Sequence, residues 1–134
     1  MGDDAKHTRQ QTADAWIRMT KAEPGSQVYE DNFWAFEVLD DLLSEDPEEG
    51  WLTILQILQQ DQSPSIVENL SAGPLEDLLA RHGSAFIDRI EAEAARNPAF
   101  AKLLGGVWQN RMTDDVWARV QAARDRRGWD GVPE

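Results

Sequence analysis

Four prolines in this chain each follow a residue that can precede an α-helix, and this pattern constrains the fold more than any other feature. The four junctions are Asp46-Pro47, Ser63-Pro64, Gly73-Pro74 and Asn97-Pro98. Proline suits the first helical position, because its missing N–H costs no hydrogen bond there and its fixed φ matches the helix. Thr113, followed by two aspartates, gives a fifth start without proline. Sustained alternation of apolar and polar residues, the signal of a strand, is nearly absent, so the sequence predicts an all-α protein.

We expect helices near residues 9–22, 28–45, 47–60, 64–71, 74–82, 84–96, 98–104 and 113–126. Gly83 and the Gly105-Gly106 pair stand where left-handed helix ends are expected. The short connections favour hairpins or sharp corners between neighbouring helices. The length favours one domain, so we predict a compact single-domain helical bundle, or a short right-angled helical array, of about 6–8 helices. This domain spans residues 9–127, between a flexible N-terminal arm (1–8) and a frayed tail (128–134).

The charge of the chain is distributed unevenly. No Lys, Arg or His occurs from Ala22 through Ala80, whereas this stretch holds fourteen Asp and Glu, and the chain has a net charge of −12. Such a block is either a solvated face or a surface that attracts a cationic partner. A pI near 4.5 argues against binding to nucleic acids or to anionic membranes, since both need clustered Lys and Arg.

The acidic residues recur at helical spacing after Val28. One predicted stripe, continued by the start of the next helix, comprises Glu30, Trp34, Glu37, Asp41, Glu45, Glu48 and Glu49. A second stripe, which we assign to the core, comprises Tyr29, Phe33, Phe36, Leu39 and Leu43. Trp34 is therefore an aromatic residue among carboxylates. Either neighbouring helices cover it, or it is an exposed anchor for a basic partner.

The two histidines are the first candidates for chemistry. His7 lies in the polar arm, and we expect it to be solvated. His82 precedes Gly83, where an imidazolium can meet the last carbonyls of a helix, so we interpret it as a capping residue. The alternative is a catalytic site in which His82 acts with Glu76 or Asp77, although no nucleophile accompanies them.

Motifs for metals and cofactors are absent from the sequence. The chain has no cysteine, which excludes disulfides and zinc sites built on sulfur. The acidic run 40–46 lacks EF-hand spacing, and neither H-E-x-x-H nor a phosphate-binding glycine loop occurs. We therefore expect no metal and no cofactor. The N-terminal sequence is polar and the longest dense apolar stretch, 51–58, is too short to span a bilayer, so we expect a cytoplasmic protein without a secretory signal.

The remaining tryptophans and the C-terminal arginines complete the candidate residues. We assign Trp16, Trp51, Trp108 and Trp117 to the core, whereas Trp129 lies in the tail. The C-terminal helix carries Arg119, Arg124, Arg126 and Arg127. These arginines either complement the helix dipole or pair with the acidic face of a second copy, which would give a head-to-tail homo-oligomer.

Several segments resemble a family of small, uncharacterised bacterial domains. They are Ala15-Trp16-Ile17, Phe33-Trp34-Ala35-Phe36 with Leu39-Asp40-Asp41-Leu42, the stretch from Leu70 to Gly83, and Leu103-Leu104-Gly105-Gly106-Val107-Trp108. The Gly-Pro-Leu-Glu-Asp-Leu-Leu sequence is the most specific part. The resemblance covers residues 13–125 and implies a compact domain, but it implies no activity because the family has none assigned.

These observations predict an acidic protein-binding module rather than an enzyme. It would act as an inhibitor or immunity-type protein that masks a basic surface of a partner such as a toxin or nuclease, without direct contact with nucleic acid or membrane. Two alternatives stay open. One is a small enzyme that uses His82 with Glu76 or Asp77, and the other is a helical scaffold or oligomerisation module.

Overall fold

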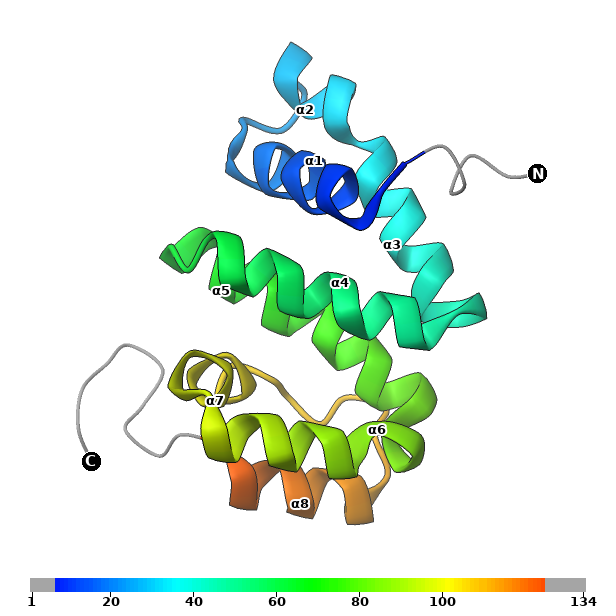
Figure 1. The fold of residues 1–134 in the computed structure, drawn as a ribbon, viewed down its shortest axis with the longest axis vertical. Helices are drawn as coiled ribbons and strands as arrows, with labels where there is room; N and C mark the ends of the chain where they lie inside the picture. Colours follow the sequence, from blue (N-terminus) through cyan, green and yellow to red (C-terminus); the bar gives the residue numbers. More distant parts are fainter. Residues whose placement is uncertain (1–6, 125–134) are drawn as a thin grey trace. The chain divides into compact units, whose positions relative to one another are not determined.

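Helices account for almost all of the regular structure in residues 7–124, which are the residues that the computed structural model describes (Figure 1). In chain order they are α1 (Arg9–Lys21), α2 (Gln27–Asn32), α3 (Trp34–Glu45), α4 (Pro47–Gln60), α5 (Pro64–Leu70), the π-helix η2 (Ser71–Leu75), α6 (Glu76–Arg96), α7 (Pro98–Leu104) and α8 (Asp114–Ala123). No strand occurs in this part of the chain. The all-α prediction is confirmed.

The chain divides into two compact units, Met1–Asn69 and Leu70–Glu134. In the first unit, α1 packs against α2, α3 and α4, and α3 packs against α4 (Figure 1). The core side chains of this unit include Trp16, Leu39, Leu43, Ile54 and Ile57, which are all almost fully buried. The prediction of one domain over residues 9–127 stays a prediction.

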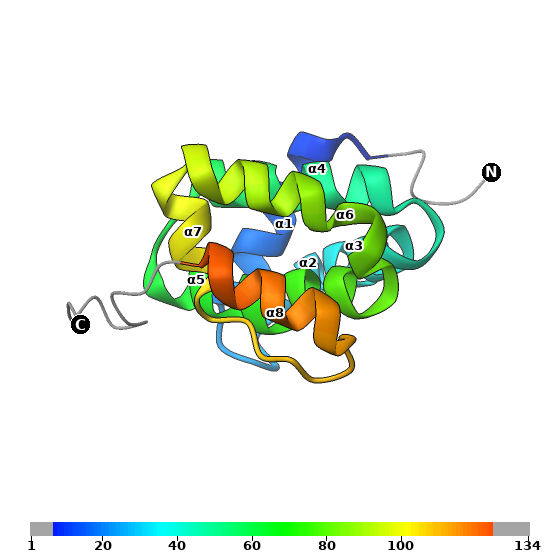
Figure 2. The same ribbon diagram turned by 90° about the horizontal axis from the view of Figure 1, so that it is seen from below.

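In the second unit, α8 and α7 both pack against α6, and α8 runs alongside α6 (Figures 1 and 2). Phe86, Ile90, Phe100, Leu104 and Val120 are among the side chains buried in this unit. Gly83 is also buried, and a Cβ atom at this position would lie 3.0 Å from both methyl groups of Val116. A glycine at position 83 therefore allows α8 to approach α6 closely.

Three of the predicted helix starts are confirmed with their caps. The Asp46 carboxylate accepts a hydrogen bond from the Glu49 N–H, Asn97 Oδ1 accepts from Ala99 and Phe100, and the Thr113 hydroxyl accepts from Val116. Pro64 also begins a helix as predicted. These starts depend only on neighbouring residues, so local sequence was enough to find them.

The predicted helix start at Gly73-Pro74 is wrong. Pro74 lies inside η2, and the chain continues from η2 into α6 without a cap. Proline has no N–H to donate to an α-helical partner, and the turn closes instead through the N–H of Glu76, which bonds to the carbonyl of Ser71. The missing donor is thus accommodated by a wider turn.

The predicted left-handed helix ends are also wrong. Gly83 has no positive φ, and two helical segments of α6 meet beside it at a kink where His82 has non-helical angles (φ −136°, ψ 25°). Gly105 ends α7 with right-handed angles (φ −63°, ψ −19°). Among the described residues, a positive φ occurs only at Gly25 and Asn110. His82 therefore stands where the first helical segment of α6 ends, and the capping role of its side chain stays a prediction.

The predicted helix 28–45 is divided at Phe33. The N–H of Phe33 bonds to the Glu30 carbonyl, and the carbonyl of Phe33 accepts from Phe36, so the tighter three-residue spacing separates α2 from α3. The predicted core stripe is consequently interrupted: Leu39 and Leu43 are buried, but the side chain of Phe36 is 47 % exposed.

Candidate functional site

The seven predicted partner-binding residues lie on three consecutive helices of the first unit. Glu30 is on α2, Trp34, Glu37, Asp41 and Glu45 are on α3, and Glu48 and Glu49 are on the first turn of α4. Trp34 and Glu49 are half-buried, whereas the other five are exposed. These two groups have different surroundings.

The exposed carboxylates of Glu30, Glu37, Asp41 and Glu45 have no hydrogen bond or ion pair with any residue of 7–124. Glu37, Asp41 and Glu45 follow each other at intervals of four residues, so they lie one above the other on α3. No basic residue occurs between positions 22 and 80 to neutralise them locally. Their negative charge is therefore directed to solvent.

An aromatic row lies beside these carboxylates. The rings of Tyr29 and Phe33 are 5.6 Å apart, and those of Phe33 and Phe36 are 5.2 Å apart and stacked. Phe36 directly precedes Glu37 at the start of α3, and it is half exposed. Helical spacing did not reveal this row, because it placed all three rings on the predicted core stripe. The acidic-aromatic face, as we call it, consists of Tyr29, Glu30, Phe33, Phe36, Glu37, Asp41 and Glu45.

Trp34 stacks against His7, which lies just before α1. The ring centroids are 3.8 Å apart and the planes are inclined by 18°. His7 is half-buried, so the prediction that it is solvated is wrong. The two residues are distant in sequence, and no local signal could have paired them. Trp34 thus fits neither predicted alternative completely. It is half-buried, and one face of its ring is covered by His7 in the segment that precedes α1.

Glu49 forms a two-pronged ion pair with Arg9. Arg9 Nε lies 2.7 Å from Glu49 Oε2, and Arg9 Nη2 lies 2.9 Å from Oε1. The hydrogen bonds from Arg9 lower the pKa of Glu49 below its ordinary value, although partial burial of the carboxyl opposes this change. The geometry links the first turn of α1 to the first turn of α4.

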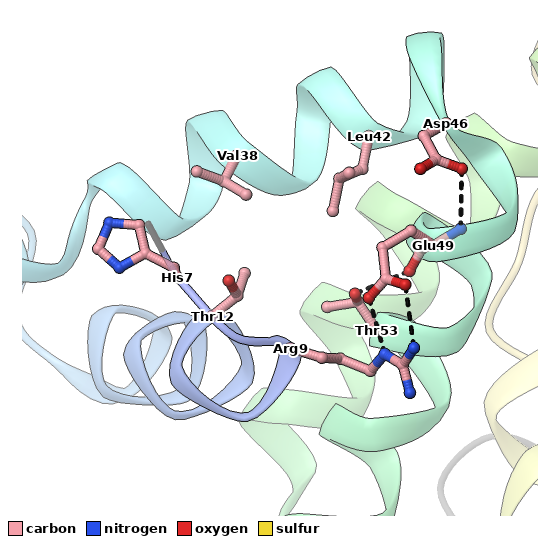
Figure 3. A pocket seen from close by; sticks show the side chains of 8 residues that line it. All are labelled: His7, Arg9, Thr12, Val38, Leu42, Asp46, Glu49 and Thr53. Carbon is pink, nitrogen blue, oxygen red and sulfur yellow. Dashed lines mark hydrogen bonds and ion pairs between the residues drawn. The ribbon is translucent and has the colours of Figure 1, made fainter. Parts of the chain in front are cut away.

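His7, Arg9 and Glu49 border a pocket of about 300 Å³ within the first unit (Figure 3). Val38 and Leu42 of α3 form its apolar wall. Its polar side chains are engaged within the unit: the hydroxyl of Thr12 donates to the Thr8 carbonyl, and that of Thr53 donates to the Glu49 carbonyl. The pocket contains no pairing of a nucleophile with a base.

The alternative catalytic residues lie at the start of α6. Glu76 is only 6 % exposed, and its two carboxylate oxygens accept hydrogen bonds from the Trp108 N–H and from Asn110 Nδ2, each at 3.0 Å. Within residues 7–124 Glu76 makes no bond to His82, which is at the kink of the same helix. Glu76 therefore holds the segment between α7 and α8, a role that the sequence analysis missed. Asp77 is half-buried beside it.

The described C-terminal arginines contact their own unit. Arg119 on α8 bonds to Glu91 and Asp88 of α6 at 2.6–2.8 Å. Hydrogen bonds from Arg119 lower the pKa of Glu91. The guanidinium carbon of Arg124 lies 5.6 Å from the centre of the Trp117 ring. Arg126, Arg127, Trp129 and the predicted tail 128–134 lie outside the described residues.

Of the predicted core tryptophans, Trp16 and Trp51 are buried and Trp117 is half-buried. Trp108 is 75 % exposed, so its assignment to the core is wrong. Trp108 lies in the segment between α7 and α8 rather than on a helix face, and the bond from its N–H to Glu76 holds the backbone there.

The described residues contain no cluster of three or more His, Cys, Asp or Glu that could hold a metal ion. In the same part of the chain, no helix combines the length and the apolar composition that crossing a membrane requires.

Residues 21–128 match the family of unknown function DUF6869, and because this match covers most of the chain, the protein belongs to that family. The resemblance to an uncharacterised family is thereby confirmed. Neither the search of curated proteins nor that of solved structures returned a match.

Proposed function

We propose that this protein is an acidic protein-binding module whose acidic-aromatic face holds a basic, partly apolar segment of another protein. The observation that carries the proposal is the juxtaposition on α2 and α3 of exposed carboxylates that have no partner in residues 7–124 with the exposed ring of Phe36. Carboxylates steer a cationic partner into contact, and a desolvated aromatic ring slows its dissociation. The carboxylates form no ion pair in residues 7–124, and about half of the Phe36 surface stays exposed despite its contact with Phe33.

The same unit already shows how such a segment can bind. His7 stacks on Trp34 and Arg9 forms a forked pair with Glu49, so a short stretch of the chain contacts the acidic helices through a ring and a guanidinium. Arg prefers carboxylates for this geometry because its planar fork matches both oxygens. The acidic-aromatic face offers the same two kinds of group to a partner.

More specifically, we propose that the protein acts as an inhibitor or immunity-type protein. The face would mask the cationic groove of a partner such as a nuclease, because the groove that holds nucleic acid is lined by Lys and Arg. The proposed site of action is the cytoplasm.

The test uses charge reversal on the face and a matched control away from it. Glu37→Lys/Asp41→Lys changes the net charge by the same amount as the control Glu23→Lys/Asp115→Lys, which alters two exposed residues that are not part of the face. Proteins captured from the source organism would be compared for the wild type and both variants. A cationic partner retained by the wild type and the control, but lost with the face variant at unchanged melting temperature, supports the proposal.

The kinetics of the captured complex distinguish the contribution of the aromatic ring of Phe36 from that of the carboxylates. Phe36→Ala should mainly increase the dissociation rate, by about tenfold if the ring contributes about 1.4 kcal/mol. Raising the salt from about 0.1 M to about 1 M shortens the Debye length from about 10 Å to about 3 Å and should mainly slow association. If both charge variants capture the same proteins as the wild type, the acidic-aromatic face is only a solvated surface and the proposal fails.

A further inference from the structure

A second surface, in the second unit, carries an arginine and two tryptophans rather than carboxylates. A cleft of about 370 Å³ lies between the turn at the end of α7 and helix α8, and its walls include Gly105, Gly106, Trp108, Trp117 and Arg124. Two of the six tryptophans of the chain line this cleft. Exposed tryptophans are rare outside binding surfaces, because a large ring gains more from burial than any other side chain.

The exposure of Trp108 is built into the fold. Its N–H bonds to the buried carboxylate of Glu76, and the side chain of Asn110 bonds to the other oxygen of the same carboxylate. Asn110 has a positive φ of 48°, which Asn tolerates better than most residues. Glu76 thus fixes both ends of the turn that presents the ring.

The polar side chains available in the cleft are those of Gln121 and Arg124, because the backbone N–H groups at its edge are already engaged. The N–H groups of Gly105, Gly106 and Val107 bond to carbonyls of α7. The side chains of Gln121 and Arg124 have no hydrogen bond or ion pair with any described residue. The guanidinium of Arg124 lies over the Trp117 ring, a position from which its edge can still donate to a carboxylate. A complementary ligand therefore carries a flat apolar group and a negative charge.

We propose that this cleft is a docking site for an acidic segment of another protein, in which an aromatic or proline side chain packs between Trp108 and Trp117 while a neighbouring carboxylate binds Arg124. The exposure of Trp108 argues for a peptide segment, because a small molecule would need to be enclosed on most of its surface. The site is independent of the acidic-aromatic face and selects the opposite charge.

The test uses two short blocked peptides, acetyl-Glu-Phe-Pro-Glu-amide and acetyl-Lys-Phe-Pro-Lys-amide, and the full chain labelled with ¹⁵N. Titration should move the indole N–H signals of Trp108 and Trp117 with the acidic peptide only. Trp108→Ala should weaken binding about tenfold or more, and Arg124→Gln several-fold, as expected for central aromatic and charged contacts. Arg111→Gln removes an exposed cation that does not line the cleft and should leave the affinity unchanged.

Three outcomes would overturn the assignment. The first is the absence of any indole shift with either peptide, and the second is equal binding of both peptides, which would remove the role of Arg124. The third is a concentration-dependent dimer of the wild type that Trp108→Ala abolishes, because a second copy of this chain would then be the occupant.

Discussion

The carboxylates of α3 and those of α6 contrast in what surrounds them. On α3, Glu37, Asp41 and Glu45 are exposed and contact no other described side chain by hydrogen bond or ion pair. On α6, Glu76 is buried with both oxygens engaged, and Glu91 is paired with Arg119. The two helices have comparable numbers of acids, yet only one of them directs its charge to solvent.

The difference shows that a count of acidic residues does not locate a binding surface. A carboxylate that is matched within its own unit serves the fold, since removing it leaves donors unpaired. A carboxylate without a partner contributes repulsion to the folded state and a field to the surroundings. Only the second kind is available to another protein, and the mutations below separate the two kinds.

The largest effect is expected at Glu76. Glu76→Ala should lower the free energy of unfolding by about 2–3 kcal/mol, because it removes both hydrogen bonds of a buried carboxylate that holds the segment between α7 and α8. Urea unfolding followed by far-UV circular dichroism measures this loss. The matched control Glu45→Ala, on the exposed row, should change stability by less than about 0.5 kcal/mol. Equal losses of unfolding free energy for both variants would contradict the distinction between the engaged carboxylate of α6 and the exposed one of α3.

An intermediate effect is expected at Asp61, at the end of α4. Its carboxylate bonds to Lys21 Nζ at 2.8 Å and to the N–H and hydroxyl of Ser63. The bond from Lys21, followed by those from Ser63, lowers the pKa of Asp61 from 3.8 to about 2. Asp61→Asn should therefore cost about 1 kcal/mol at neutral pH.

The lowered pKa of Asp61 also fixes how this cost depends on pH. A carboxyl with a lower pKa in the folded state stabilises the fold above its ordinary pKa, and the contribution is lost as the pH falls towards the folded value. The stability difference between wild type and Asp61→Asn should thus be constant above about pH 5 and shrink from about pH 4 to about pH 2. A difference that stays constant down to pH 2 would contradict the assignment.

The smallest effect on stability is expected on the acidic-aromatic face. Glu37→Gln/Asp41→Gln should change the free energy of unfolding by less than about 0.5 kcal/mol, and in the stabilising direction, because it relieves repulsion. The gain should be greater at about 0.01 M salt, where the Debye length is about 30 Å, than at about 1 M. Thermal unfolding at both salt concentrations measures it. Clear destabilisation would mean that these carboxylates serve the fold after all.

The sequence predicted those parts of the fold that depend on neighbours along the chain. The caps at Asp46, Asn97 and Thr113 are examples, because a cap and the N–H groups it satisfies lie within three residues. The positions of Glu30, Glu37, Asp41 and Glu45 on exposed helix surfaces also followed from helical spacing.

What the sequence could not predict depends on contacts between distant residues. Gly83 was predicted to be left-handed, but it has no positive φ, and its missing Cβ instead allows Val116 of α8 to approach. Trp108 was assigned to the core, but it is exposed in a segment that a bond to Glu76 holds. The division at Phe33 left Phe36 exposed. For Gly83 and Trp108 the environment depends on a residue far away in the sequence, which periodicity cannot reveal, whereas the division at Phe33 arises from local bonds over three residues.

The gap in basic residues has a consequence for digestion. Helices α2–α5 contain no lysine or arginine, and the basic residues that flank the gap are Lys21, at the end of α1, and Arg81, within α6. A protease that cleaves after lysine or arginine therefore finds no bond to cut in residues 22–80, even when the chain is unfolded. Such an enzyme releases the whole acidic-aromatic face as one fragment and separates it from the cleft of the second unit.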